Sequence, residues 1–389
     1  MIWPFRRRSD DEDEKQGAPG ESRVTRYTVP DDFSTLGEAI ESAREGSTIS
    51  VRPGRYRENL DFAGKSVSLV SENPEDPDTV RRTIIDGTGR GSVIVFASGE
   101  DERASLRGFT ITGGRAEMLL APGGGGIVIR NESCPRIEHN VICDNESDLD
   151  GGGIFVDDSW PVIRRNTITG NTADGSGGGI HIGRDSNIVS PEEVDQVFAQ
   201  TMLEAIEESR IETTQISALD SDADFTIRDF INVGPEEDVQ REERTRPVIE
   251  GNTITGNAAL AGGGIFISDE APVLESNAIR ENRARRGAGV CLWDNCRAVL
   301  TGNFIGENMA DTEGGGLIVE WGASPVLSKN RIVNNAAPRG PALSVAQNSA
   351  PLVHQNHFQN RHGDAGQSVH FWALHLAVMR DNHFEGADR

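Results

Sequence analysis

Tryptophan, carboxylate and histidine side chains lie in one region of a repeated sequence motif, of which "GGGIFVDDSWPVIRRNTITGN" at residues 151–171 is one copy. Aromatic rings stack on sugar faces, and carboxylates accept hydroxyl hydrogen bonds or exchange protons as acid and base. The residues of this group are Asp157, Asp158, Trp160, His181, Asp269, Trp293, Asp294, Glu320 and Trp321. We predict Asp157, Asp158 and His181 as catalytic residues, and the other six as ligand-binding residues.

His181 is the candidate base, and a base of this kind needs a carboxylate nearby to orient it. Asp157 or Asp158 could provide that carboxylate from the preceding copy of the motif. A histidine in such a position is also compatible with an inert surface side chain, and this alternative stays open.

The sequence motif recurs along the chain with a period that indicates a stack of similar coils. Its glycines begin at residues 124, 151, 177, 262, 287, 314 and 340, in steps of 25 to 27 residues apart from one step of 85. Asparagines recur in two columns, the first at Asn140, Asn166, Asn252, Asn277, Asn303, Asn330, Asn356 and Asn382, the second at Asn145, Asn171, Asn257, Asn282, Asn308 and Asn335. Each repeat holds three short strands that cannot close a core alone, so the coils must stack. Asparagine suits the corners because it tolerates a left-handed backbone and can bond to the equivalent amide one coil away.

The strand after each glycine group alternates between the two faces of the expected sheet. Its outward positions are Val128, Phe155, His181, Phe266, Cys291, Ile318 and Ser344. Strand positions that face solvent are normally polar, so an apolar column predicts either a ligand surface or a surface that another part of the chain covers.

These repeats, with the opening "YTVPDDFSTLGEAIESAREGSTISVRPGRYREN", resemble the right-handed parallel β-helix proteins of the pectate-lyase-like superfold. The resemblance covers about residues 24–386. It implies an all-β, single-stranded right-handed parallel β-helix of about 26 residues and three strands per coil. A short helix with Leu36, Ala39, Ile40 and Ala43 on its apolar face would cap the N-terminal end.

The superfold hosts polysaccharide lyases, esterases, hydrolases and epimerases as well as scaffolds without activity, so the fold does not decide the function. The catalytic motifs of polygalacturonases, pectate lyases and pectin esterases are missing from the sequence. Whether the chain is an enzyme therefore stays open, with a lyase, a hydrolase or an epimerase as the candidates. The leading hypothesis is a module that binds or processes a polysaccharide or another elongated ligand.

The 85-residue step contains an insertion at residues 184–246 with 17 acidic and six basic residues. A capping pattern at Ser190 starts a predicted helix, whose apolar stripe contains Val194, Val197, Phe198, Leu203 and Ile206. The stripe could cover Phe155, His181 and Phe266. The alternative function is accordingly a non-catalytic scaffold whose insertion recruits a protein partner. Asp220, Asp222 and Asp224 have the spacing of a calcium loop but lack its glycine and its final glutamate, so calcium is only a weak candidate.

Overall composition limits the partners. The 389 residues carry a net charge of −24, which disfavours binding to nucleic acid or to an anionic membrane surface. Residues 1–23 read as a disordered charged tail, and no segment is long and apolar enough for a membrane span. The chain has no evident secretory signal, which predicts a cytoplasmic protein, or a secreted one if the start codon is misassigned. The histidines near the C-terminus fit no metal-binding template, so no metal ligands and no cofactor are predicted.

Overall fold

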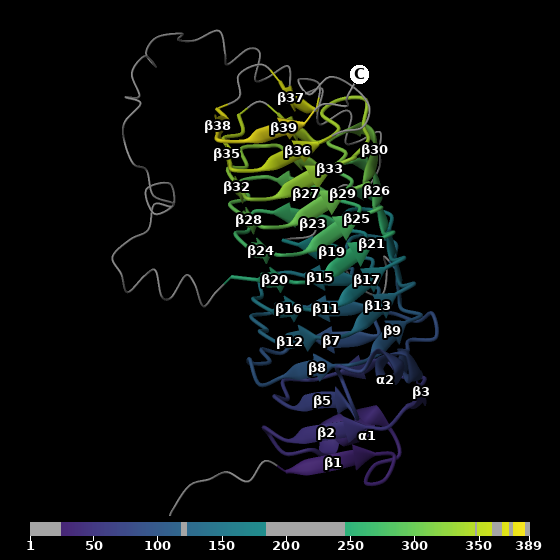
Figure 1. Ribbon diagram of the computed structural model, residues 1–389. Coiled ribbons are helices and arrows are strands. Elements are labelled where there is room, and N and C mark those ends of the chain that lie inside the picture. Colours follow the sequence, from purple (N-terminus) through teal and green to yellow (C-terminus); the bar gives the residue numbers. More distant parts are fainter. Residues whose placement is uncertain are drawn as a thin grey trace, which may run out of the picture.

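The structure, a computed structural model, describes residues 25–117, 123–183, 246–346, 348–359, 368–372 and 376–385. In these ranges the strands stack into a long solenoid that runs from β1 at one end to β39 at the other (Figure 1). Neighbouring strands pair in parallel about one repeat apart, as where Ile154 pairs with Ile127 on one side and Ile180 on the other. The predicted parallel β-helix is therefore confirmed.

Two long sheets form adjoining faces of the solenoid. Sheet A contains β1 (Arg26–Val29), β2 (Thr48–Val51), β5 (Ser68–Ser71), β8 (Ser105–Arg107), β12 (Arg136–Glu138), β16 (Val162–Arg164), β20 (Val248–Glu250), β24 (Val273–Glu275), β28 (Val299–Thr301), β32 (Val326–Ser328), β35 (Leu352–His354) and β38 (Val378–Arg380). Sheet B contains β3 (Gly54–Tyr56), β6 (Thr83–Asp86), β9 (Thr110–Thr112), β13 (Val141–Cys143), β17 (Thr167–Thr169), β21 (Thr253–Thr255), β25 (Ala278–Arg280), β29 (Phe304–Gly306), β33 (Arg331–Val333), β36 (His357–Gln359) and β39 (His383–Glu385).

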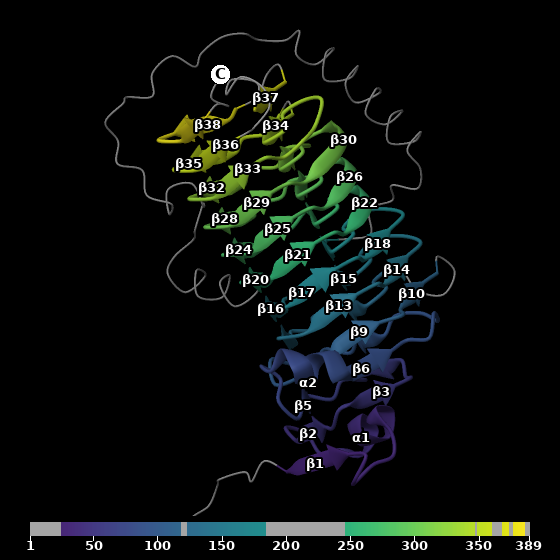
Figure 2. The same ribbon diagram turned by 45° about the vertical axis from the view of Figure 1, so that its right-hand side comes forward.

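Two further sheets complete the coils. Sheet C contains β4 (Leu60–Asp61), β7 (Ile94–Phe96), β11 (Ile127–Ile129), β15 (Ile154–Val156), β19 (Ile180–Ile182), β23 (Ile265–Ser268), β27 (Val290–Trp293), β31 (Leu317–Val319), β34 (Leu343–Val345) and β37 (Val369–Phe371). Sheet D contains β10 (Arg115–Ala116), β14 (Glu146–Ser147), β18 (Thr172–Ala173), β22 (Ala258–Ala261), β26 (Arg283–Arg286) and β30 (Met309–Glu313). Three strands per coil were expected, and this short fourth strand, which lies between sheets B and C in chain order, is an addition in the middle of the solenoid (Figure 2).

The core is a set of columns of apolar side chains inside the coils. Ile137, Ile163 and Ile249, from successive strands of sheet A, are all fully buried, and so are their counterparts in sheets B and C. A side chain of this kind stabilises the fold by roughly 1.5–3 kcal/mol when it is buried. Because each coil repeats the same inward positions, the core continues from one coil to the next.

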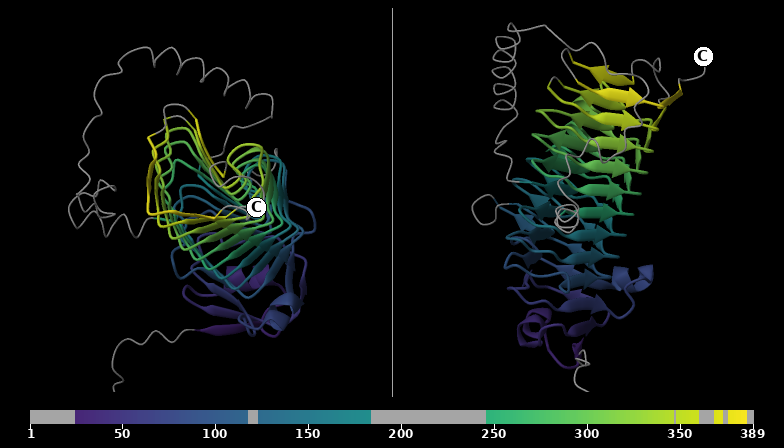
Figure 3. Two further views of the ribbon diagram at one scale, coloured as in Figure 1. Left: turned by 45° about the horizontal axis from the view of Figure 1, so that its top comes forward. Right: turned by 90° about the vertical axis from the view of Figure 1, so that its left-hand side faces the viewer.

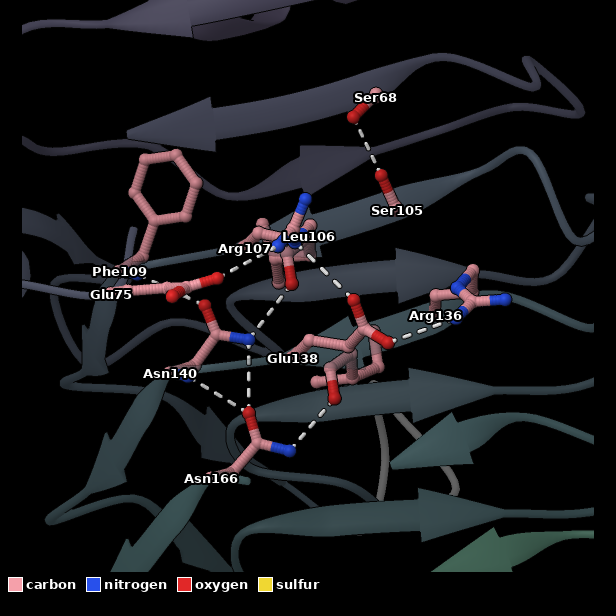
Figure 4. Close-up of polar contacts among 11 residues, drawn as sticks. Ser68, Glu75, Ser105, Leu106, Arg107, Phe109, Arg136, Glu138, Asn140 and Asn166 are labelled. Atoms are coloured by element: carbon pink, nitrogen blue, oxygen red, sulfur yellow. Dashed lines mark hydrogen bonds and ion pairs between the residues drawn. The ribbon is translucent and has the colours of Figure 1, made fainter. Parts of the chain in front are cut away.

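Both asparagine columns form hydrogen-bonded ladders at corners of the coils. In the first ladder, Nδ2 of Asn140 donates to Oδ1 of Asn166 at 3.1 Å and to the carbonyl of Leu106 at 2.9 Å (Figure 4). The backbone N–H of Asn140 also donates to the same Oδ1 at 2.9 Å. The predicted bonding between equivalent amides is confirmed, and it satisfies polar groups at corners that are buried.

The prediction that the corner asparagines adopt a left-handed backbone was wrong. The ladder asparagines do not have the left-handed backbone. The residue before each asparagine has it instead, as at His139, Arg165, Ser276 and Lys329, with φ between 53° and 57°. The asparagines of the ladders are therefore explained by their amides and not by their backbone conformation.

A short helix covers the N-terminal end, as predicted. Helix α1 (Leu36–Ser42) buries Leu36, Ala39 and Ile40 against the first coil, and the side chain of Thr35 caps it by accepting from the N–H of Glu38. A second helix, α2 (Pro77–Arg82), was not predicted; it packs over sheet B, where the Thr110 hydroxyl donates to the carbonyl of Val80. Neither helix, nor any other in the described residues, is long and apolar enough to cross a membrane.

Candidate functional site

The column expected to face solvent on sheet C is buried. Val128 is 6% exposed, and the other six members, Phe155, His181, Phe266, Cys291, Ile318 and Ser344, are 0% exposed. Of the two interpretations of this apolar column, a ligand surface and a surface that another part of the chain covers, the structure therefore supports the second. They point away from the main core, as the alternation of the strand requires, but into a second packed region that includes Ala261, Phe266, Cys291 and Ile318.

The glycine corner between sheets D and C covers this column. A Cβ atom added at Gly177 would lie 2.7 Å from Cβ of His181, and one added at Gly262 would lie 2.7 Å from Cβ of Phe266. Only a residue without a side chain permits so close an approach. The chain therefore folds back over the outer face of sheet C, and the outline of the stacked coils turns inward on one side (Figure 3).

Five aromatic rings follow one another beneath the glycine corner from one coil to the next, the first three stacked and the two tryptophans tilted. The His181 ring lies between Phe155, at a centroid distance of 4.9 Å, and Phe266, at 5.1 Å. Phe266 lies 6.3 Å from Trp293, and Trp293 lies 5.2 Å from Trp321. We call these five residues the ring stack. Its first three members are buried and its two tryptophans are half-buried, so only the tryptophan end can contact a ligand from solvent.

His181 belongs to a buried polar group that the sequence did not reveal. Its Nδ1 lies 3.1 Å from Oγ of Ser176, and that hydroxyl donates to Oδ1 of Asp150 at 2.7 Å. The carboxylate beside His181 is therefore Asp150, at 3.9 Å, and not Asp157 or Asp158. With all three side chains at most 2% exposed, this group serves the packing of the coils in the structure as described.

Four of the predicted residues occupy the turn that leads from sheet C to sheet A. Asp158, Asp269, Asp294 and Trp321 all have positive φ, at 43°, 53°, 35° and 55°. Aspartate tolerates this conformation better than most residues do, so part of the acidic row has a structural explanation. Trp321 does not have that explanation, because a bulky residue is unusual in a left-handed backbone.

The carboxylates of this turn influence one another across several coils. Burial, followed by the charge of Asp269, raises the pKa of Asp294. Burial also raises the pKa of Glu270, and the nearby charges of Asp269, Asp158 and Asp157 raise it further. The structure thus brings Asp157, Asp158, Asp269 and Asp294 into one acidic row and adds Glu270, which sequence reasoning missed. The repeat spacing alone could have indicated Glu270, since it follows Asp269 directly.

Glu320 and Trp160 lie apart from the acidic row. Glu320 is 1% exposed and points toward the glycine corner between sheets D and C. There its Oε2 lies 3.2 Å from Nη2 of Arg286. Burial raises the pKa of Glu320 to about 7, although the charge of Arg286 acts to lower it. Trp160 is half-buried at the start of sheet A and contacts none of the other rings within the described residues.

Two members of the ring stack, Phe155 and Trp293, each have an arginine guanidinium over the ring. The guanidinium of Arg286 lies 4.9 Å from the ring centre of Trp293, and the guanidinium of Arg130 lies 4.6 Å from that of Phe155. Such contacts stabilise by roughly 0.5–1 kcal/mol at exposed sites, and by more when they are buried. Arg286 therefore contacts both Trp293 and Glu320. The repeat pattern could not show this role, because the residue type at this position changes from coil to coil, through Ser176, Ala261, Arg286, Glu313 and Arg339.

Three predictions concern residues outside those that the structure describes, and one of them is the charged tail at residues 1–23. The helix with the stripe Val194, Val197, Phe198, Leu203 and Ile206, and the weak calcium loop at Asp220, Asp222 and Asp224, both lie in residues 184–245. The described chain leaves sheet C at Gly183 and re-enters sheet A at Val248. The insertion thus replaces the turn of one coil, between the turn with Asp157 and Asp158 and the turn with Asp269.

A hollow of about 540 Å³ lies on the solenoid away from these turns. Sheet D lines it, mainly through Ala258, Leu260, Arg283 and Met309. The acidic row and the tryptophans do not contribute to it. A ligand of the predicted residues would therefore lie along the edge between sheets C and A.

One family model agrees with this architecture. Residues 238–388 match the family model described as a right handed beta helix region, and residues 28–201 match a model described as a protein of unknown function (DUF1565). A search of the curated proteins finds no match. Among solved structures, an alginate lyase from Paenibacillus sp. str. FPU-7 is similar to this chain, with 14% sequence identity and a TM-score of 0.41 over 90% of this chain and 95% of that chain.

Proposed function

We propose that this parallel β-helix binds a polysaccharide along the edge between sheets C and A. The observation that carries this proposal is the half-buried pair Trp293 and Trp321, which lies beside the exposed carboxylates of Asp269 and Asp294. Rings that face solvent next to carboxylates suit a hydroxyl-rich chain, which offers apolar ring faces and hydrogen-bond donors.

The backbone at Trp321 supports the same proposal. The equivalent turns at Asp158, Asp269 and Asp294 use aspartate in the left-handed conformation, whereas this turn uses tryptophan at φ 55°. A bulky residue in that conformation costs of order 1–3 kcal/mol. A function of the Trp321 ring would account for a bulky residue at this strained position. Its place beside Trp293 favours stacking on a sugar.

The negative charge along the edge between sheets C and A disfavours anionic glycans. Asp157, Asp158, Asp269 and Asp294 would repel a polyanion such as a uronate chain unless cations lie between them. A neutral glycan or a glycan with amino groups meets no such penalty. The raised pKa values of Glu270 and Asp294 make these two groups the candidates for donating a proton if the bound chain is also cleaved.

A binding panel with the full chain tests the proposal. Affinity electrophoresis against neutral glucans, a chitosan and an alginate, with and without calcium, measures which glycan retards the protein. We expect Trp321→Ala to weaken binding roughly 10-fold, the equivalent of about 1.4 kcal/mol. Met309→Ala, which removes an exposed side chain from sheet D, is the matched control. If no glycan retards the protein, or if Trp321→Ala binds like the parent, the proposal is wrong.

A second function, a scaffold that recruits a protein partner, is favoured by the position of the insertion. The chain departs at Gly183 in the middle of the acidic row, between Asp158 and Asp269. Removal of residues 186–245, joined by a short turn, would leave the strand pairing between β16 and β20 intact. Loss of a stoichiometric partner from a pull-down, with the solenoid still folded and glycan binding unchanged, would favour the scaffold over the glycan-binding role.

A further inference from the structure

Two histidines and a glutamate meet on the outer face of sheet B at the C-terminal end of the solenoid. His357 lies in β36, and His383 and Glu385 lie in β39, the last strand of that sheet. His357 pairs with His383 in register, and Glu385 is two residues further along the same strand. Because alternate residues of a strand share a face, all three side chains point to the same side.

Both imidazoles face the same carboxylate. Nε2 of His357 lies 3.6 Å from Oε2 of Glu385, and Nε2 of His383 lies 3.3 Å from Oε1. The two rings stack with their centroids 5.0 Å apart. One donor atom from each residue can be chosen so that all three lie within 4.8 Å of one another, and the described residues contain no second group of this kind.

These separations suit one small metal ion. Zinc binds histidine nitrogen at about 2.0–2.1 Å and carboxylate oxygen at about 2.0–2.2 Å in a tetrahedral arrangement, so its ligand atoms lie roughly 3.3 Å from one another. Both imidazoles already lie at about that spacing from the Glu385 carboxylate, each from a different oxygen, so a shared ion requires a small rotation of these side chains. The side chains of His357, His383 and Glu385 are 30%, 65% and 44% exposed, so an ion can reach them and small rotations can complete the site.

We propose that His357, His383 and Glu385 form a binding site for a divalent transition metal, with zinc as the reference ion. Two imidazoles and one carboxylate are ligands that zinc, copper and nickel prefer, whereas calcium and magnesium prefer oxygen ligands throughout. Three protein ligands leave a fourth position open to water or to another ligand. The sequence did not predict this site, because the spacing of its ligands matches no known metal-binding motif. The ligands are one coil apart and become neighbours only through the pairing of β36 with β39.

The site would tie the last coil to the one before it. Strand β39 ends sheet B, so one of its edges has no partner strand among the described residues. An ion held by His357 on one strand and by His383 and Glu385 on the next links the two strands by bonds that the unfolded chain does not make. Metal binding should therefore raise the thermal stability of the C-terminal coils.

The test uses the full chain after treatment with a chelator and dialysis. Calorimetric titration with Zn²⁺ measures the stoichiometry and affinity, and the visible spectrum with Co²⁺ reports the ligand set. We expect one ion per chain, a Co²⁺ spectrum without thiolate charge transfer, and an increase in melting temperature with Zn²⁺ but not with Mg²⁺ or Ca²⁺. His383→Ala and Glu385→Gln should each weaken Zn²⁺ binding at least 10-fold. His354→Ala is the matched control, since His354 lies in sheet A in the same coil as His357.

Three outcomes would overturn the proposal. They are the absence of saturable Zn²⁺ binding, equal binding by the parent and by a His357→Ala and His383→Ala double variant, and a thiolate band that places the ion on the half-buried Cys134 or Cys143. Each variant is checked for its melting temperature in chelator, so that a folding defect is not mistaken for the loss of a ligand. None of these readouts depends on glycan binding.

Discussion

Arg286 and Glu320 form an ion pair in the fold between sheets D and C, with 3.2 Å between Nη2 and Oε2 and side chains that are 9% and 1% exposed. Two charges removed from water in this way need each other, because a buried charge without its partner typically destabilises a protein by about 3–5 kcal/mol. Arg286 also lies over Trp293, so the pair connects the interior of the fold with the proposed ligand edge.

The first prediction concerns the effect of pH on stability. Burial raises the pKa of Glu320 from 4.5 to about 7, so the folded chain binds this proton more tightly than the unfolded chain does. The contribution of Glu320 to stability is then fully present below about pH 4.5 and is lost as the pH rises through about 7. The free energy of unfolding should fall by about 3 kcal/mol over this interval relative to Glu320→Gln. Denaturant titrations of both proteins at several pH values measure the difference.

Arg286→Met extends this test. Since the charge of Arg286 lowers the pKa of Glu320, its removal should move the loss of stability to higher pH. Parallel pH profiles for the parent, Glu320→Gln and Arg286→Met would contradict the assignment of the transition to Glu320.

The second prediction concerns the asparagine ladder. Oδ1 of Asn277 accepts from the backbone N–H and the side chain of Asn252, and its Nδ2 donates to the Ile249 carbonyl and to Asn303. Asn277→Ala removes these bonds and leaves buried partners unsatisfied, so we expect a loss of roughly 3 kcal/mol or more in the free energy of unfolding. Asn73→Ala, at an exposed position, should change stability by less than about 0.5 kcal/mol. Similar losses for the two variants would refute the structural role of the ladder.

The third prediction separates two reasons for glycine. Gly256 and Gly262 both have left-handed backbones, with φ of 66° and 63°. A Cβ at Gly256 would meet only the Thr169 hydroxyl at 3.9 Å, whereas one at Gly262 would lie 2.7 Å from Cβ of Phe266. Gly256→Ala should therefore cost about 1–2 kcal/mol, for the backbone alone. Gly262→Ala should cost at least about 2 kcal/mol more, and equal melting temperatures would show that the glycine corner does not press on the ring stack.

The fourth prediction concerns the charge of the ligand. If a chitosan binds at the edge, its affinity should fall as salt is added, because exposed charges are screened within about 10 Å at 0.1 M salt. Asp269→Asn combined with Asp294→Asn should reduce both the affinity and the salt dependence, while a neutral glucan should be affected much less. Affinity measured at two salt concentrations decides this. An unchanged salt dependence in the double variant would place the cationic ligand elsewhere.

Much of the fold could be predicted from the sequence because repetition makes a local pattern reliable. The columns of Ile154, Asn166 and Gly151 recur at one period, and each residue type has a single physical task at its position, in the core, in the ladder or at the corner. The cap helix followed from the apolar spacing of Leu36, Ala39 and Ile40.

The candidate site was harder to predict, because it depends on how the coils bend. Alternation along β15 and β19 correctly turned Phe155 and His181 away from the core. It could not show that the glycine corner folds back over them, since that requires the contact between Gly177 and His181. Asp150, Ser176 and Arg286 were missed because they act across coils, in positions where other coils have different residues. Glu270 was missed although it directly follows Asp269 in a turn that the repeat spacing identifies.

The insertion has a consequence for how freely this protein can acquire new parts. The N–H of Asn140 reaches Oδ1 of Asn166 across 26 residues at 2.9 Å, and the N–H of Asn166 reaches Oδ1 of Asn252 across 86 residues at the same 2.9 Å. The entropy of closing a loop grows only with the logarithm of its length, so the longer connection costs about 1 kcal/mol more. An additional segment at one turn therefore destabilises the solenoid by less than the loss of a single ladder asparagine would. Each such turn is accordingly a suitable position for grafting a new binding element.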